Sequence, residues 1–198
     1  MNKYAKVISS GSYLPEKILT NKDLEKMVQT TDEWITERTG IKERRISADD
    51  ETSVDMALSA SERAIKNSGI DKSKIGAIIL ATCTPERKFP STAVLLQNKL
   101  GLSETFSFDV NAACTGFIYA LDIAKQYIES GKIEYALVVG TEKITSLLDW
   151  TDRNTCVLFG DGAGAMILGG SDEPGIMSST IGSDGSYKDL LTVNTDLE

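Results

Sequence analysis

The sequence predicts an α/β fold, with a mixed, mostly parallel β-sheet covered by helices. Three observations support this class. Apolar runs of strand length alternate along the chain with amphipathic segments of helix length. Two strand candidates, at 75–82 and 135–141, are almost entirely apolar, which is typical of strands buried on both faces. Glycine follows each of three long helix candidates, where helices commonly end.

The expected elements follow one another in a β-α-β-α-β order. The first strand is expected at 6–15, ending at Pro15. Thr52 is a suitable N-cap for a helix that continues to Ser68, just before Gly69. The elements expected next are a strand at 75–82, a helix at 91–100, a strand at 106–110, a helix at 114–130 and a strand at 135–141. Right-handed crossovers between parallel strands would place helices on both faces of the sheet.

The pattern changes after Trp150. Residues 155–170 and 175–186 contain many glycine and apolar residues without helical spacing, so we expect two strands that close the sheet as a hairpin-like pair. Within the chain, no linker rich in proline, glycine or serine separates these segments from the earlier ones. One domain over residues 1–198 is therefore expected.

Composition excludes several classes of function. The formal charge of -8, with a pI near 4.7, argues against a nucleic-acid-binding surface. No apolar run approaches the ~20 residues that span a bilayer, and the N-terminus does not resemble a signal peptide, so a cytoplasmic protein is expected. The three cysteines are far apart and histidine is absent, so neither a disulfide framework nor a metal site is expected.

The strongest candidate for chemistry is Cys114, in the run DVNAACTGF (109–117). A strand gives way to a helix there, so the sulfur would lie at a helix N-terminus, where unpaired N–H groups favour an anion. A thiolate in that position is a competent nucleophile. Gly116 would let a substrate approach the first turn. The alternative is an inert buried cysteine, which suits Cys83 and Cys156 better because they lie in or beside apolar runs.

A second candidate group lies in TTDEWITERTG (30–40), which is expected to form a short capped helix. Trp34 and Arg38 are four residues apart and would share one helix face. An indole beside a guanidinium can hold a planar base and a phosphate, although a Trp near an Arg is more often ordinary packing than a ligand clamp.

GDGAGA (160–165) has the glycine spacing of a dinucleotide fingerprint. That fingerprint needs a helix directly after it, whose N-terminus meets the pyrophosphate. Strand-like residues follow here instead, so we expect no nucleotide site. The glycines are expected to allow strands to pack closely.

Taken together, the motifs resemble the N-terminal half of the β-ketoacyl-[acyl-carrier-protein] synthase III family, thiolase-fold enzymes that start bacterial fatty-acid synthesis. The resemblance extends along the chain through GSYLPEKILTNKDLEKMVQTTDEWITERTGIKERRI (11–46), FPSTA (89–93), AACTGF (112–117), YALVVGTEK (135–143), DRNTCVLFGDGAGA (152–165) and SDGSY (183–187). It implies a thiolase-like domain that is one α/β half of a two-half αβαβα fold, with the C-terminal half absent from this chain.

The resemblance also implies a reaction, a decarboxylating Claisen condensation. Cys114 would accept an acyl group from a primer acyl-CoA, and malonyl-acyl-carrier protein would then lose carbon dioxide and attack the thioester. The coenzyme A thioester is a substrate, and no bound cofactor is expected. The second half of the family fold supplies a histidine and an asparagine for decarboxylation, and this chain contains no histidine.

By family position, seven further residues would contact substrate in a homodimer. Trp34 and Arg153 would sandwich the adenine of coenzyme A, with Thr30 and Arg38 beside the nucleotide. The acyl chain would pass the remaining three, which are Phe89 in the pocket of the neighbouring subunit and Phe159 and Leu191 along the channel. Two alternatives stay open: a truncated, non-catalytic dimerisation or interaction module, and a thiolase-fold acyltransferase that uses a different acceptor.

Overall fold

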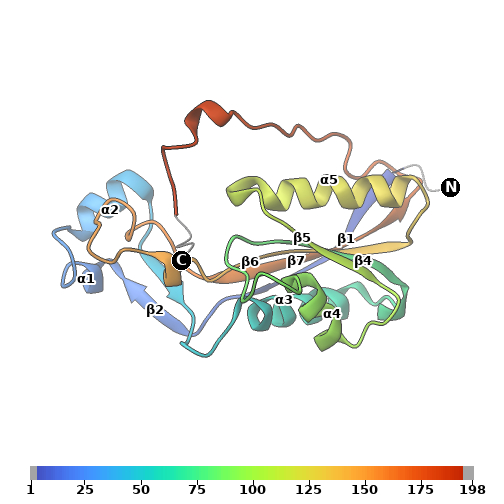
Figure 1. The fold of residues 1–198 in the computed structure, drawn as a ribbon, viewed down its shortest axis with the longest axis horizontal. Helices are drawn as coiled ribbons and strands as arrows, with labels where there is room; N and C mark the ends of the chain where they lie inside the picture. Colours follow the sequence, from blue (N-terminus) through green and yellow to red (C-terminus); the bar gives the residue numbers. More distant parts are fainter. Residues whose placement is uncertain (1–3, 194–198) are drawn as a thin grey trace.

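Two β-sheets organise the chain in this computed structural model, which describes residues 4–193 (Figure 1). The strands are β1 (Tyr4–Tyr13), β2 (Lys17–Thr20), β3 (Glu43–Ile46), β4 (Ile75–Ala81), β5 (Phe106–Val110), β6 (Tyr135–Glu142) and β7 (Gly162–Ser171). The α-helices are α1 (Asn21–Leu24), α2 (Asp32–Thr39), α3 (Ser53–Ser68), α4 (Thr92–Leu100) and α5 (Gly116–Glu129). Short 3₁₀ turns are η1 (Lys72–Lys74), η2 (Ala113–Thr115), η3 (Ile144–Leu147) and η4 (Gly185–Tyr187).

The larger sheet has the strand order β1-β7-β6-β4-β5. β4 pairs in parallel with both β5 and β6, whereas β7 pairs antiparallel with β6 and with β1. Four strands therefore run in one direction and β7 runs against them. The predicted mixed, mostly parallel sheet is confirmed.

Helices cover both faces of this sheet, with α3 and α4 on one side and α5 on the other (Figure 1). The side chains of β4 alternate between the two layers. Ile78 and Leu80 join the core under α3 and α4, and Ala77 and Ile79 join the core under α5. The run is continuously apolar because both of its faces are buried.

The predicted helix limits depend on caps that the structure contains. The Thr52 side chain accepts a hydrogen bond from the Asp55 N–H, and the Asp55 side chain accepts one from the Thr52 N–H, which forms a capping box at the start of α3. Gly69, Gly101 and Gly131 follow α3, α4 and α5 with positive φ angles of 67°, 67° and 72°. Glycine adopts this left-handed conformation without steric cost, so these helices end where the sequence indicates.

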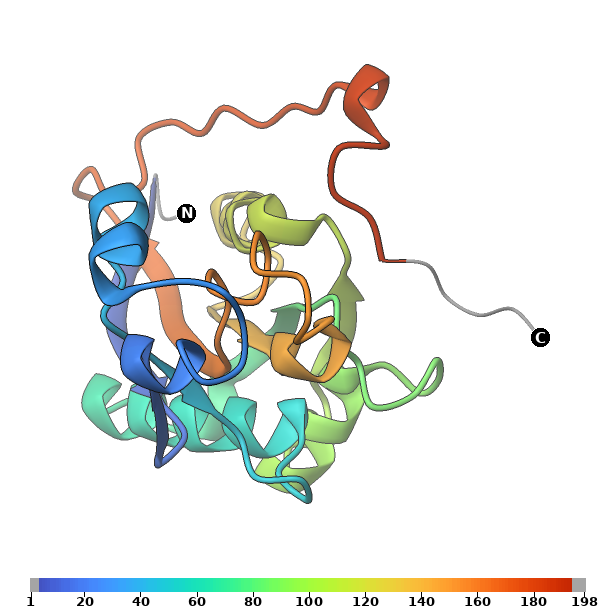
Figure 2. The ribbon, with the colours of Figure 1, turned by 90° about the vertical axis from the view of Figure 1, so that its left-hand side faces the viewer.

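The hairpin-like pair predicted for residues 155–170 and 175–186 is wrong. Only the later part of the first segment forms a strand, β7, and it lies between β6 and β1. β1 pairs with β7 along its whole length, from Tyr4↔Ser171 to Tyr13↔Ala163. Both edges of β7 are therefore occupied, and residues 175–186 cannot pair with it. Those residues instead run in irregular conformation along the outer side of α5 (Figures 1 and 2), where the Tyr119 hydroxyl donates to the Gly182 carbonyl at 3.1 Å.

The small sheet of β2 and β3 packs with α1 and α2 into a separate apolar cluster that includes Cys156. Arg44 of β3 is buried there, and its guanidinium donates to Asn21 Oδ1 at 2.7 Å and to the Val157 carbonyl at 2.5 Å. These bonds tie the lobe that carries α2 to the loop before β7. In residues 4–193 no helix has the length and apolarity needed to cross a membrane.

Two glycines of the GDGAGA run (160–165) allow close packing where the start of β7 and the loop before it meet β1 and β3. A Cβ on Gly160 would lie 2.9 Å from Arg44 Cβ, and one on Gly162 would lie 3.2 Å from the Tyr13 carbonyl oxygen. The expectation that these glycines allow close packing is confirmed at both positions.

Candidate active site

Cys114 is an exposed free thiol in the turn that joins β5 to α5. The sequence predicts that the helix starts at Cys114, but residues 113–115 form the 3₁₀ turn η2 and α5 starts at Gly116. The physical reason lies at Ala113, whose φ of 45° cannot continue a right-handed helix. The thiol therefore lies just before the N-terminus of α5.

The turn itself is strained. Ala113 is the one non-glycine residue with positive φ in the described part of the chain, and such a conformation costs an L-residue roughly 1–2 kcal/mol. The Thr115 hydroxyl donates to the Ala112 carbonyl at 2.9 Å, and this bond closes the turn. Gly116 packs against β4, because a Cβ there would lie 3.2 Å from Ala81 Cβ. The expected approach of substrate at Gly116 is therefore wrong, since protein already occupies that side.

A loop that the sequence analysis does not connect with Cys114 lies next to the turn. The Cys83 thiol is half-buried and donates to Asn111 Oδ1 at 3.4 Å. The Cys83 N–H in turn donates to Glu142 Oε1 at 2.7 Å. Burial, followed by the nearby Glu142 carboxylate, raises the pKa of the Cys83 thiol. Cys156 is fully buried, so the prediction of an inert core cysteine suits Cys156 and not Cys83.

Sequence contains one signal that could have found this loop. β4 and β5 are adjacent parallel strands, so the residues just after each strand meet at the same edge of the sheet. Cys83 follows β4 and Asn111 follows β5. Glu142, the last residue of β6, reaches the same edge from the other side of β4.

Trp34 forms the centre of the second candidate group. It lies on α2, whose N-cap Thr31 accepts a hydrogen bond from the Trp34 N–H at 3.1 Å, as expected for a short capped helix. The Arg38 guanidinium lies 4.6 Å from the ring centroid, and that of Arg153 lies 4.3 Å from it. The fold thus brings Arg153 to Trp34 from more than a hundred residues away.

Two polar atoms in this region have no hydrogen-bond partner. Thr30 Oγ1 and Arg153 Nε are both buried and unpaired. A buried polar atom without a partner costs free energy unless a ligand or water satisfies it. A planar base between Trp34 and Arg153 would need a separation of about 7 Å, twice the ordinary contact distance, so Arg153 has to move outward to admit one.

The three residues expected along the acyl path are in different places. Phe89 lies in the loop before α4 and is 83% exposed, at a cis peptide bond to Pro90. Phe159 is half-buried just before β7, and Leu191 is 65% exposed in the C-terminal segment.

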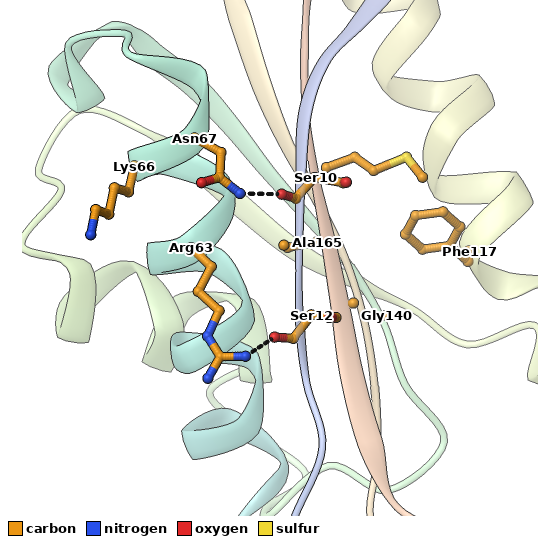
Figure 3. A pocket seen from close by; sticks show the side chains of 11 residues that line it. Ser10, Ser12, Arg63, Lys66, Asn67, Phe117, Gly140 and Ala165 are labelled. Atoms are coloured by element: carbon orange, nitrogen blue, oxygen red, sulfur yellow. Dashed lines mark hydrogen bonds between the residues drawn. The ribbon is translucent and has the colours of Figure 1, made fainter.

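A cavity has a volume of about 760 Å³, and none of the predicted site residues is among those that line it. Figure 3 shows the side chains that line this cavity. Asn67 and Arg63 of α3 line it and donate to the carbonyls of Ser10 and Ser12 at 2.9 and 2.6 Å. Phe117, in the first turn of α5, is its nearest lining residue to Cys114 along the chain. The Asn67 and Arg63 side chains are therefore already paired with the backbone of β1. In the described part of the chain no group of three or more acidic or cysteine side chains could hold a metal ion.

Comparison with known proteins agrees with this fold and this turn. A family model described as 3-oxoacyl-[acyl-carrier-protein (ACP)] synthase III matches residues 108–185, which include Cys114. The β-ketoacyl-[acyl-carrier-protein] synthase III of Alkalilimnicola ehrlichii is 53% identical over 191 residues, which are 96% of this chain and 59% of that protein.

Two solved structures have the same fold. The synthase III of Thermus thermophilus superposes with a TM-score of 0.88 at 42% identity, over 92% of this chain and 57% of that one. The synthase III of Aquifex aeolicus gives a TM-score of 0.83 at 53% identity, over 85% and 55% of the two chains. The chain thus spans somewhat under three fifths of the length of each solved relative.

The fold and these matches identify the class: the chain is one half of a thiolase-like fold from the thiolase-fold condensing enzymes. Within that class it is a homologue of β-ketoacyl-[acyl-carrier-protein] synthase III, and it corresponds to the N-terminal portion of that acyltransferase.

Proposed function

We propose that the chain is the nucleophile-bearing part of a β-ketoacyl-[acyl-carrier-protein] synthase III that initiates type II fatty-acid synthesis. The exposed thiol of Cys114, in a strained turn before the N-terminus of α5, is the observation that carries this proposal. Homology over nearly the whole chain supports it. A cytoplasmic location is part of the same proposal.

In the first half-reaction the Cys114 thiolate attacks the carbonyl carbon of a primer acyl-CoA. The carbonyl electrons move onto oxygen, and the tetrahedral intermediate collapses with loss of the coenzyme A thiolate, which leaves an acyl-Cys114 thioester. Cys114 lies just before the start of α5, and a helix N-terminus favours negative charge. The chain's own residues can therefore support acylation.

In the second half-reaction malonyl-acyl-carrier protein loses carbon dioxide, and the resulting enolate attacks the acyl-Cys114 carbonyl. A carbon–carbon bond forms and Cys114 leaves as the thiolate. The resemblance assigns the histidine and asparagine of this step, and a glycine N–H of the oxyanion hole, to a second α/β half. Removal of one oxyanion donor lowers rates by ~10²- to 10³-fold, so we infer that residues 1–198 need that half for condensation.

The Trp34 group is proposed to bind coenzyme A. Its two guanidiniums supply positive charge for phosphates, and the indole supplies a stacking surface for adenine. The unpaired Thr30 Oγ1 and Arg153 Nε are available to a ligand. Movement of Arg153 away from Trp34 would open the adenine site.

A homodimer is proposed through the free edge of β5. The other edge strand, β1, is less available for pairing with a second copy, because α3 side chains donate hydrogen bonds to its Ser10 and Ser12 carbonyls. β5 ends the sheet on the opposite side, and unpaired edges invite pairing with a second copy. The exposed Phe89 lies in the loop after β4, the strand beside β5, so it could reach a partner's acyl pocket. Phe159 and Leu191 are proposed to line the acyl path within one subunit.

The test is acyl transfer to a single thiol. Incubation with radiolabelled acetyl-CoA should label Cys114, as located by peptide mapping, and Cys114→Ala should abolish the label. Cys156→Ala, at a buried cysteine, is the control that should keep it. Absence of label from the wild-type chain, even with a synthase III C-terminal half supplied in trans, contradicts the proposal.

A further inference from the structure

Glu142 is a half-buried carboxylate at the end of β6 that the mechanism above does not use. Its two oxygens accept hydrogen bonds from the Cys83 N–H at 2.7 Å and from the Thr84 hydroxyl at 2.6 Å. In the part of the chain that the structure describes, no lysine or arginine forms an ion pair with it. The neighbouring Lys143 directs its Nζ to the carbonyls of residues 48, 49 and 51. A carboxylate buried without a cation is costly, so its retention here needs an explanation.

The contacts of Glu142 fix the loop that follows β4. Thr84 Oγ1 also accepts the Lys143 N–H at 2.8 Å, so the end of β6 binds this hydroxyl through both its side chain and its backbone. Ser53 Oγ donates to the Thr84 carbonyl at 2.8 Å, which adds a contact from the start of α3. Cys83 is thereby held between two fixed neighbours.

This loop contacts the turn that carries Cys114. The Thr82 N–H donates to the Val110 carbonyl at 3.3 Å, and the Cys83 thiol donates to Asn111 Oδ1 at 3.4 Å. Asn111 leads directly into Ala112 and Ala113, where the backbone is strained. A strained turn keeps its conformation only when surrounding structure holds it, and the loop is the neighbour that touches it from β4.

We propose that Glu142 is a positioning residue for Cys114: it clamps residues 82–84, which in turn hold the 111–115 turn and place the thiol before the N-terminus of α5. The inference rests on the proposed function only for the role of Cys114 as acyl acceptor. Glu142 has no contact with substrate in this scheme, and it acts through Thr84 and Cys83.

A purely electrostatic role for Glu142 predicts the opposite result in one measurement. Neutralising a nearby negative charge stabilises a thiolate, so Glu142→Gln would make Cys114 react faster. Loss of positioning moves the thiol away from the helix N–H groups, so the same change would make Cys114 react more slowly. Thr84→Val separates the two, because it keeps the Glu142 charge and removes the hydroxyl that Glu142 binds.

The experiment measures the rate at which iodoacetamide alkylates Cys114 at neutral pH, resolved by peptide mass spectrometry from Cys83 and Cys156. Six proteins are compared: wild type, Glu142→Gln, Thr84→Val, the double variant of these two, Thr84→Ser and Glu134→Gln. Thr84→Ser retains the hydroxyl. Glu134→Gln is the matched control, because Glu134 is an exposed carboxylate that precedes the same strand and pairs with Lys74. Circular dichroism checks that each variant is folded.

Positioning predicts that Glu142→Gln and Thr84→Val each slow alkylation of Cys114 by about two- to fivefold, the range of typical helix-terminus charge effects. The double variant should be no slower than either single one, since both break the same contact. Thr84→Ser and Glu134→Gln should match wild type. If Glu142→Gln fails to fold, the Val and Ser variants at Thr84 give the same comparison.

Two results would overturn the inference: faster alkylation in Glu142→Gln with no change in Thr84→Val, or rates in both that equal those of Glu134→Gln. Labelling by acetyl-CoA is measured in parallel. Wild-type protein whose Cys114 is alkylated but takes no acetyl group, even with a synthase III C-terminal half supplied in trans, rejects the proposed function and leaves the positioning result standing.

Discussion

Asp161 offers the sharpest test of how the large sheet is joined to the small sheet of β2 and β3. This carboxylate is 5% exposed and accepts four hydrogen bonds. Oδ2 accepts from the Ser47 N–H, the Ser47 hydroxyl and the Thr145 hydroxyl at 2.8, 2.9 and 2.6 Å, and Oδ1 accepts from the Thr145 N–H at 3.0 Å. One side chain thus connects the residue after β3 with η3 and with the start of β7.

Asp161→Asn keeps the shape and changes one acceptor into a donor. The amide oxygen can take the position of Oδ2, but the amide NH₂ then faces the Thr145 N–H, so two donors meet. Loss of one hydrogen bond to a charged group costs about 1.5–3 kcal/mol. For a chain of this size each kcal/mol corresponds to about 2–4 °C in melting temperature, so we expect a fall of about 3–12 °C. Asp161→Ala, which leaves all four donors without an acceptor, should lower it further.

The assay is thermal unfolding followed by circular dichroism, with Asp50→Asn as the control. Asp50 is exposed in a turn close to Ser47 in sequence, so its substitution should leave the melting temperature unchanged. A melting temperature of Asp161→Asn within about 1 °C of the control would refute the inferred role of this hydrogen-bond network.

Three further predictions follow from single residues. Trp34→Ala should weaken binding of coenzyme A by about tenfold in calorimetry, because the stacking surface is lost, whereas unchanged affinity would place the nucleotide elsewhere. Gly11→Ala should lower the free energy of unfolding by about 1–3 kcal/mol in urea titration, because its Cβ would lie 2.3 Å from the Ala60 carbonyl oxygen. Gly164→Ala is the control, since a Cβ there has open space and should not change stability. Equal effects of the two substitutions would contradict this steric argument. Burial raises the pKa of Glu142, so its protonated form is favoured in the folded state, and stability present at low pH should be lost as pH rises through that raised value. Glu142→Gln should remove this loss, and a wild-type advantage over it that grows with pH would show that the sign is wrong.

The helices and the buried strands were predictable because their signals are local. A cap such as Thr52 and a stop such as Gly69 act on residues within one turn, so sequence spacing is enough to find them. The strand β4 is equally predictable from its apolar run, since burial on both faces requires apolar side chains along the strand. The motif around Cys114 also indicated a nucleophile turn, although the left-handed Ala113 moved the start of α5 to Gly116.

The partners of strands and side chains were not predictable in the same way. The glycine-rich segment 155–170 was predicted to contain a strand, but the place of β7 between β6 and β1 depends on which edges other strands occupy. Trp34 and Arg38 are linked by helical spacing, whereas Arg153 reaches the same ring only through packing of the loop before β7 against the small lobe. Nothing local to Glu142 indicates that it binds residues 83 and 84.

Local patterns were enough to predict the α/β class, the cap positions and the nucleophile candidate, because these depend on side chains a few residues apart. Long-range packing sets the position of β7, the irregular course of residues 175–186, the contact of Arg153 with Trp34 and the link from Glu142 to the turn of Cys114. Each of these joins segments distant in the chain. Their geometry depends on how the sheet orders its strands, which nearest-neighbour chemistry does not specify.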